Sequence, residues 1–285
     1  MNILDELVKK DKFSNSEKEL ADYILENKNK ILNMSVQQIA KETYTSTSSI
    51  VRLCQKMGLK GFADFKIEFA VQLQKQNTAT NSIDANFPFN KNDSFHEITK
   101  KLYQLSSDSL NETYQKMQYK DYEKAALLIK NAKKVAAFGT GDSYTRALEF
   151  QSKMMKINCV VHTSHLMNED SVLASTLTKD DCALVISYSG ETRYTLETVK
   201  ILVKNKVPII TITGRVGSPI AKRSNVILEL PNHESQSYRF APFSSHVGIE
   251  FILNNLYAYY FVLDYDNHVK HRLGIEINNI EAKIR

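Results

Sequence analysis

Residues 135–143 read VAAFGTGDS and residues 183–192 read ALVISYSGET, and these two stretches decide the fold. Each starts with an apolar run and continues through small polar residues into a segment of helical periodicity, a pattern typical of a strand-to-helix turn. Further apolar strands at 159–162, 208–213 and 226–230 alternate with helical segments, which predicts a parallel sheet with helices on both faces. The second half of the chain is therefore predicted to be a doubly wound parallel α/β domain.

The two turns, residues 139–143 and 187–192, are predicted to bind an anion. Helix N-termini leave backbone N–H groups unpaired and carry the positive end of the helix dipole, and Ser or Thr side chains add neutral donors. Turns on neighbouring parallel strands meet at the carboxyl edge of the sheet, where open α/β folds bind their ligands. The expected ligand is a phosphorylated small molecule.

Nucleotide cofactors are not expected in these turns. Gly139 and Gly141 lack the third glycine of a dinucleotide fingerprint, and the strand that ends near His162 carries no acidic residue placed for a ribose. No Gly-Lys-Ser or Gly-Lys-Thr sequence follows either turn, which excludes a P-loop. No cofactor is therefore predicted.

The composition is that of an ordinary globular protein, long enough for about two domains. Of the 285 residues, 42% are apolar, and the net charge of +5 is too small to indicate nucleic-acid binding by itself. Cys54, Cys159 and Cys182 lie apart without C-x-x-C spacing, so we expect reduced thiols, no disulfide and no metal site. The N-terminus carries no apolar signal segment, and residues 247–265 are too polar to span a membrane. A cytoplasmic protein without a membrane partner is expected.

Two short helices separated by a tight turn are predicted in the N-terminal region. Ser35 and Gln38 form a capping box at the start of the first helix. After a break at residues 43–45, Ser46 caps a second helix, which Gly58 ends. This is the helix-turn-helix arrangement, whose second helix enters the major groove of DNA by its N-terminal residues.

The second of these helices carries the groups that a DNA-reading helix needs. Small hydroxyls can approach phosphates and base edges, and cations one and two turns later add charge. Ile50, Val51 and Leu53 form the side that is expected to be buried. The same hydroxyl cluster also suits an exposed turn and cap, so this helix alone leaves both interpretations open. The candidate DNA-binding residues are Thr45, Ser46, Thr47, Ser48, Ser49, Arg52 and Lys56.

Both halves of the chain resemble one bacterial family. Residues 35–40 (SVQQIA) and 49–66 (SIVRLCQKMGLKGFADFK) closely resemble the N-terminal domain of RpiR/MurR-type transcriptional regulators, in which Arg52 matches a characteristic arginine. The turns at 139–143 and 187–192 resemble those of the sugar isomerase (SIS) domain that follows in these regulators. The resemblance implies a DNA-binding regulator of carbohydrate metabolism whose SIS domain binds a phosphosugar effector. It also implies a homodimer or homotetramer on double-stranded operator DNA.

The resemblance further implies particular residues for the phosphosugar. The family's phosphate-binding hydroxyls fall on four positions that all carry a hydroxyl here, and three neighbours complete the predicted site. The hydroxyl residues are Ser143, Ser187, Ser189 and Thr192, and the neighbours are Gly141, Gly190 and Glu191.

One residue departs from the family pattern. Tyr44 stands in the helix-turn-helix turn, where the family usually has glycine. Because tyrosine tolerates a positive φ poorly, either the turn has a different geometry or its backbone is strained.

Four segments are expected along the chain. Residues 1–77 form the helix-turn-helix domain, and residues 78–118 form a linker and a connecting helix. Residues 119–265 form the SIS domain, and residues 266–285 form a C-terminal tail. Within the SIS domain, the segment His233–Phe243 is expected to line the sugar cleft and to set sugar specificity.

Two alternatives to a regulator remain open from the residues. A phosphosugar isomerase with an accessory helical domain needs a Glu or His base beside the sugar. The other alternative is an interaction protein that binds no DNA, in which the helical part only dimerises. The DNA-binding domain that precedes the sheet favours the regulator, so no residue is predicted to be catalytic. The candidate bases for the isomerase are Glu191, His162, His165, His233 and Glu234.

Overall fold

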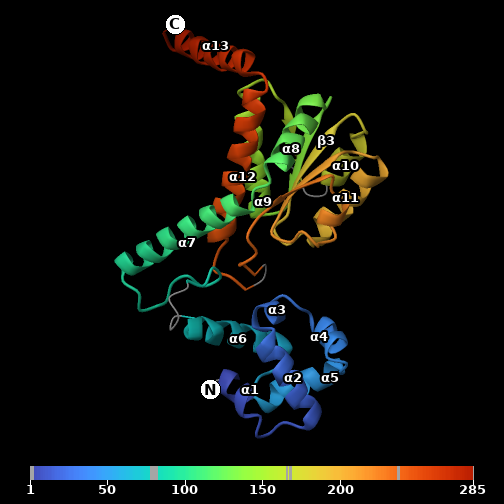
Figure 1. Cartoon of the computed structure of the whole chain (residues 1–285), viewed down its shortest axis with the longest axis vertical. Coiled ribbons are helices and arrows are strands. Elements are labelled where there is room, and N and C mark those ends of the chain that lie inside the picture. Colours follow the sequence, from blue (N-terminus) through green and yellow to red (C-terminus); the bar gives the residue numbers. More distant parts are fainter. Residues whose placement is uncertain (1–2, 78–82, 165, 167–168, 236–237, 285) are drawn as a thin grey trace. The chain divides into compact units, whose positions relative to one another are not determined.

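The computed structural model describes residues 3–77, 83–164, 166, 169–235 and 238–284 of the chain (Figure 1). It divides into two compact units. The helical unit contains Met1–Leu105 together with His233–Ala241, and the sheet unit contains Ser106–Asn232 together with Pro242–Arg285.

The helical unit is built on six helices around one apolar core. The largest fully buried side chains of this core include Phe65 and Phe69, whose rings stack with their centroids 5.1 Å apart. Leu20, Ile39 and Leu53, from three other helices, pack into the same core. The helices are α1 (Ile3–Lys9), α2 (Asn15–Glu26), α3 (Lys28–Leu32), α4 (Val36–Glu42), α5 (Thr47–Lys56) and α6 (Phe62–Asn77).

The predicted caps of the helix-turn-helix are confirmed. At the start of α4, the Gln38 N–H donates to Ser35 Oγ at 3.2 Å, and the Ser35 N–H donates to Gln38 Oε1 at 2.7 Å. At the start of α5, the Ser49 N–H donates to Ser46 Oγ at 3.1 Å. Gly58, just beyond α5, has a φ of 75°, the conformation that favours glycine after a helix.

The sheet unit contains a five-stranded, all-parallel sheet in the order β2-β1-β3-β4-β5. The predicted parallel α/β fold is confirmed. The edge strand β2 is shorter than the sequence suggests, because only its last two predicted residues pair with β1. The strands are β1 (Val135–Gly139), β2 (Val161–His162), β3 (Cys182–Ile186), β4 (Ile209–Thr213) and β5 (Val226–Glu229).

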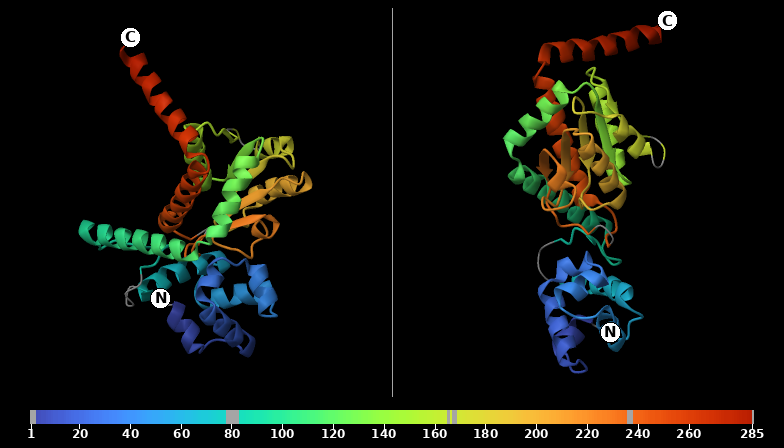
Figure 2. Two further views of the ribbon diagram at one scale, coloured as in Figure 1. Left: turned by 45° about the horizontal axis from the view of Figure 1, so that its top comes forward. Right: turned by 90° about the vertical axis from the view of Figure 1, so that its right-hand side faces the viewer.

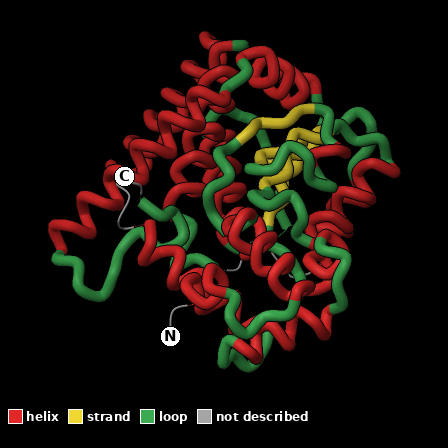
Figure 3. Tube along the Cα trace, turned by 60° about the horizontal axis from the view of Figure 1, so that its bottom comes forward, coloured by secondary structure: helices red, strands yellow, loops and turns green. Residues whose placement is uncertain are grey.

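Helices cover both faces of this sheet (Figure 2). Side chains alternate across β1, with Val135 and Ala137 in one apolar cluster and Ala136 and Phe138 in the other. The first cluster includes residues of α8 (Tyr119–Asn131), α9 (Asp142–Met155) and α12 (Phe243–Val262), and the second includes residues of α10 (Glu169–Thr176) and α11 (Arg193–Lys204). Burial on both faces explains why the central strands are continuous apolar runs. Figure 3 shows the strands in yellow, with helices in red and loops in green.

Three further elements complete the description. The long helix α7 (Phe95–Lys116) contributes its first part to the helical unit and the rest to the sheet unit, and a 3-10 turn, η1 (Ala221–Arg223), precedes β5. The segment that the sequence suggests as a tail forms the helix α13 (Tyr265–Ile284). Of the helices described, none is both long and apolar enough to cross a membrane.

Candidate functional site

The sheet register places the two predicted anion-binding turns side by side. β1 and β3 are neighbours, and Gly139 pairs with Ile186, so Thr140 and Ser187 leave the sheet at the same edge. The Thr140 hydroxyl lies 3.1 Å from the Thr195 hydroxyl, which links the first turn to the helix that follows the second. One ligand can therefore contact both turns at the carboxyl edge of the sheet.

The first turn depends on glycine at two positions. Gly141, immediately before α9, has a φ of 58°, which L side chains rarely adopt. A Cβ on Gly139 would lie 2.9 Å from the carbonyl carbon of Ser143, so only glycine allows the strand and helix to approach this closely. Ser143 thus lies in the first turn of α9, where helix N–H groups and a hydroxyl can bind an anion together.

The second turn also depends on glycine, and one of its residues forms an ion pair. Gly190 has a φ of 62°, and a Cβ there would lie 2.0 Å from Ser218 Oγ. Ser189 Oγ accepts the Glu191 N–H at 3.2 Å, and the Glu191 carboxylate pairs with Arg215 at 3.1 Å. Thr192 immediately precedes α11. The sequence-based interpretation missed Arg215, although it follows β4 at the same edge of the sheet.

The Ser187 hydroxyl is the strongest indication of a binding site at the carboxyl edge of the sheet. The residue is 3% exposed, and its hydroxyl has no hydrogen-bond partner among the residues that the structure describes. Buried hydroxyl groups are almost always hydrogen-bonded, because an unpaired one loses the bonds it made to water. A ligand oxygen at this edge of the sheet would supply the missing partner.

The candidate bases for an isomerase lie in different elements of the chain. Glu191 is paired with Arg215, and Glu234 belongs to the helical unit, where it pairs with Arg239 at 2.6 Å. His162 is exposed at the edge strand β2, and His165 lies outside the described residues. His233 also belongs to the helical unit.

The cysteines and the potential metal ligands of the described residues indicate no further reactive or metal-binding site. All three thiols are free and buried, and burial raises the pKa of Cys54 and Cys182 to about 12. Thiols with such a pKa stay protonated and unreactive at neutral pH. The described part of the chain contains no cluster of three or more His, Cys, Asp or Glu residues that could hold a metal ion.

The turn between α4 and α5 keeps the geometry that glycine would favour. Tyr44 has a φ of 53° and is 98% exposed, so the tyrosine accepts a left-handed backbone and packs against nothing. Of the two outcomes that the sequence allowed for this residue, the strained backbone is the one observed.

Tyr44→Gly is expected to raise the free energy of unfolding of the helical unit by about 0.5–1 kcal/mol. The left-handed conformation costs an L residue about 1–2 kcal/mol, and the greater freedom of glycine in the unfolded chain offsets part of that gain. Urea denaturation of the full-length protein measures the change. Tyr44→Ala is the control, since it removes the ring but keeps the strained Cβ, and an equal gain there would contradict the explanation.

The predicted DNA-reading helix α5 and its cap expose most of the candidate DNA-binding residues. Thr45 and Ser49 are half-buried, whereas the other candidates are exposed, namely Ser46, Thr47, Ser48, Arg52 and Lys56. Arg52 Nε donates to the Ser48 carbonyl at 3.4 Å. The Ser46 and Ser49 hydroxyls lie 2.9 Å apart at the cap, and the Thr45 hydroxyl lies 2.8 Å from that of Thr43. The inward side differs slightly from expectation, because Val51 is half-buried while Cys54 and Met57 are buried. Gln55, which the sequence interpretation missed, is exposed one turn after Arg52.

Lys56 has a structural partner. Its ammonium group lies 2.6 Å from the Glu17 carboxylate of α2 and also donates to the Lys12 carbonyl at 3.3 Å. The Glu17 side chain is 9% exposed and that of Lys56 is 41% exposed. Burial raises the pKa of Glu17, but hydrogen bonds from Lys56 and Ser14 outweigh burial and hold it below its ordinary value. This pair fixes α5 against α2.

Lys56→Met is expected to destabilise the helical unit by about 1–2 kcal/mol, because the buried Glu17 carboxylate keeps its bond from the Ser14 N–H but loses its cationic partner. Lys18→Met is the matched control, since Lys18 is exposed on α2, and it should change stability by less than about 0.5 kcal/mol. Because the folded pKa of Glu17 lies below the unfolded value of about 4.3, its contribution is present above that pH. It is lost as the pH falls through the folded pKa. Equal urea midpoints for the two variants at pH 7 would contradict this role.

Comparison with known proteins agrees with this geometry. Residues 1–76 match the helix-turn-helix domain of the rpiR family, and residues 128–255 match the SIS domain. An uncharacterized HTH-type transcriptional regulator from Clostridium perfringens is 33% identical over 264 residues, which cover 90% of this chain and 91% of the relative. The HTH-type transcriptional regulator HexR from Pseudomonas aeruginosa is 25% identical over 247 residues, covering 86% and 84% of the two chains.

A solved structure shares the fold over the full length. The Vibrio vulnificus NanR protein, complexed with ManNAc-6P, aligns with a TM-score of 0.67 at 22% identity and covers 99% of each chain. The helix-turn-helix, the parallel sheet and the relatives agree in domain content and order. The chain therefore belongs to the RpiR family of helix-turn-helix transcriptional regulators that carry a SIS domain.

Proposed function

We propose that this regulator binds operator DNA through α5 and that a phosphosugar bound at the two turns of the sheet changes its affinity for DNA. The observation that carries the proposal is the buried Ser187 hydroxyl, which has no hydrogen-bond partner among the described residues and lies at the start of the second of two glycine-dependent turns at one sheet edge. The genes it controls would be those of carbohydrate metabolism. Both ligands occur in the cytoplasm, where we expect the protein to act.

The DNA contact is assigned to the exposed side of α5. Ser48 and Arg52 lie one turn apart, and Gln55 extends the same exposed side. Arginine binds guanine through two parallel hydrogen bonds, and glutamine binds adenine in the same manner. A homodimer or homotetramer would place two such helices in successive major grooves of a palindromic operator. Thr45, Ser46 and Ser49 act mainly as turn and cap residues in this proposal, with their backbone close to the DNA phosphates.

The phosphate of the effector is assigned to the turns, with Ser143, Ser187, Ser189 and Thr192 as hydroxyl donors. The N–H groups that follow Gly141 and Gly190 lie at helix starts, where an anion is stabilised by the helix dipole. The Glu191–Arg215 pair can position the sugar hydroxyls. NanR is complexed with ManNAc-6P, which supports a phosphosugar as the ligand class.

The regulator is proposed to have no catalytic activity. An isomerase must move a proton between adjacent carbons through a positioned base. Glu191 is held by Arg215, and Glu234 is held by Arg239. These ion pairs suit carboxylates that position neighbouring groups rather than carboxylates that take up a proton.

Fluorescence anisotropy tests the proposal. Labelled DNA from upstream of the protein's own gene is titrated with the full-length protein, alone and with N-acetylmannosamine 6-phosphate, glucose 6-phosphate or fructose 6-phosphate. Saturable binding that one phosphosugar shifts by about 5- to 150-fold is expected, whereas inorganic phosphate should have little effect. Weak, salt-sensitive binding that no sugar changes, together with turnover of one sugar, would establish the isomerase instead.

A further inference from the structure

The segment His233–Ala241, here called the inserted segment, joins the two units of the chain. It follows β5 of the sheet unit and precedes α12, also of the sheet unit, yet its own contacts place it in the helical unit. The sequence suggested that these residues line the sugar cleft. That expectation stays a prediction, and the contacts of the segment within the helical unit point to a further role.

Asn86 holds the inserted segment in the helical unit through three hydrogen bonds. Its side-chain Nδ2 donates to the His233 carbonyl at 3.2 Å, and its side-chain Oδ1 accepts the Ser235 N–H. Its main-chain carbonyl accepts the Phe240 N–H at 2.9 Å. Asp84 Oδ1 accepts from both the N–H and the Nδ2 of Asn86, which fixes the orientation of the amide. One asparagine therefore binds both ends of the segment.

The inserted segment also reaches the helices that support the helix-turn-helix. The Ser235 hydroxyl donates to Asn33 Oδ1 at 3.1 Å, directly after α3 and two residues before the cap of α4. The Tyr238 ring lies 4.9 Å from the ammonium of Lys66, which donates to the Met34 carbonyl at 2.8 Å. Tyr238 also packs against the core of the unit. A displacement of the segment therefore acts directly on the support of α4 and α5.

An ion pair links two described residues of the inserted segment. Glu234, whose side chain is 0% exposed, pairs with Arg239 at 2.6 Å. Phe240 packs edge-on against Phe87, with the ring centroids 5.0 Å apart. These contacts link Glu234 to Arg239 within the segment and Phe240 to Phe87 of the helical unit.

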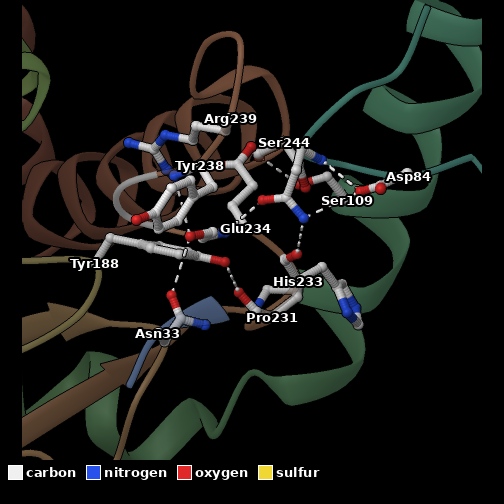
Figure 4. Close-up of polar contacts among 12 residues, drawn as sticks. Asn33, Asp84, Ser109, Tyr188, Pro231, His233, Glu234, Tyr238, Arg239 and Ser244 are labelled. Carbon is white, nitrogen blue, oxygen red and sulfur yellow. Dashed lines mark hydrogen bonds and ion pairs between the residues drawn. The ribbon is translucent and has the colours of Figure 1, made fainter. Parts of the chain in front are cut away.

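The residues that flank the inserted segment are anchored within the sheet unit (Figure 4). The Tyr188 hydroxyl donates to the Pro231 carbonyl at 3.0 Å, and a Cβ on Gly214 would lie 3.1 Å from the Tyr188 ring and 3.2 Å from that carbonyl. On the other flank, the Ser109 hydroxyl donates to the Ser244 carbonyl at 2.7 Å. Tyr188 stands between Ser187 and Ser189 in the second turn, so the anchor of the segment is part of the proposed effector site.

We infer that the inserted segment transmits effector binding from the second turn to the helix-turn-helix, an inference that rests on the proposed function. A phosphosugar that draws Ser187 or Ser189 toward it moves Tyr188, and tight packing against Gly214 couples this motion to Pro231. Only Asn232 separates Pro231 from His233, so the chain spans at most about 7 Å there and has little slack. The displacement then reaches Asn86 and Asn33 through the bonds described above.

Asn86→Ala in the full-length protein tests the inference. We measure operator affinity by anisotropy and phosphosugar affinity by calorimetry, using N-acetylmannosamine 6-phosphate, glucose 6-phosphate and fructose 6-phosphate as probes. Each affinity measured separately should stay within about threefold of wild type. The effector-induced change in operator affinity should fall from about 5- to 150-fold to less than about twofold. Asn92→Ala, an exposed asparagine of the same linker, should keep the wild-type change.

Ser235→Ala provides a second variant, which removes the side-chain bonds to Asn33 and from the Tyr238 N–H and leaves Asn86 in place. It should also reduce the effector-induced change. If both variants keep the wild-type change, the inference is overturned while the proposed function stands. If the wild-type protein itself shows no effector-induced change, the proposed function fails and the inference fails with it.

Discussion

Arg52→Ala is expected to lower operator affinity by about 30-fold or more while phosphosugar binding stays at the wild-type level. An arginine that binds a guanine contributes about 1–3 kcal/mol, and a dimer carries two such contacts. Arg52 is exposed on α5 and donates only to the Ser48 carbonyl at 3.4 Å in the described structure, so its loss leaves the core intact. Anisotropy at fixed salt measures the operator affinity, since binding to DNA phosphates depends strongly on salt.

Two variants separate base reading from charge at this position. Arg52→Lys keeps the charge but loses the planar fork of donors, so it should bind nonspecific DNA normally and the operator weakly. Lys18→Ala removes an exposed cation from α2 and should have little effect. An Arg52→Ala protein with wild-type operator affinity would show that α5 does not read the operator through this residue.

Ser187→Ala is expected to lower phosphosugar affinity by about 10- to 150-fold, because a hydrogen bond to a charged group contributes about 1.5–3 kcal/mol. Operator binding without effector should be unchanged, and the response to effector should need about 10- to 150-fold higher effector concentrations than in the wild type. Ser175→Ala is the control, since Ser175 is exposed on α10 and its hydroxyl donates to the Ser171 carbonyl.

Ser187→Ala should weaken phosphosugar binding without lowering the stability of the free protein. Without ligand, the Ser187 hydroxyl is buried and has no partner within the described residues. Removing such a group should leave the melting temperature of the free protein unchanged or raise it. A protein that loses affinity for the phosphosugar and also unfolds at lower temperature would point to a structural role for Ser187 instead.

Local sequence patterns predicted the helix caps and the two strand-to-helix turns. The capping box at Ser35 and the cap at Ser46 depend on residues three positions apart, and both are present. The two turns depend on apolar strands followed by glycine and hydroxyl residues, and the parallel register brings them to one edge. In each case the physics that sets the structure acts within a few residues or through a regular repeat.

Local sequence patterns could not predict contacts between side chains that are distant in the sequence. Lys56, whose contact with DNA stays a prediction, pairs with Glu17, 39 residues away. Glu191 pairs with Arg215 across two neighbouring strands. The inserted segment depends on Asn86, which lies 147 residues from His233. Such contacts follow from the packing of whole elements, and no periodicity of the chain specifies them.

The central claim, that effector and operator binding are coupled, is tested most directly by measuring the coupling from the effector side. Calorimetry gives the affinity of the full-length protein for the phosphosugar, first alone and then saturated with operator DNA. Coupled sites must change each other's affinities by the same factor. We expect the two phosphosugar affinities to differ by about 5- to 150-fold, the factor by which the sugar changes operator affinity. Equal affinities with and without operator would contradict the account.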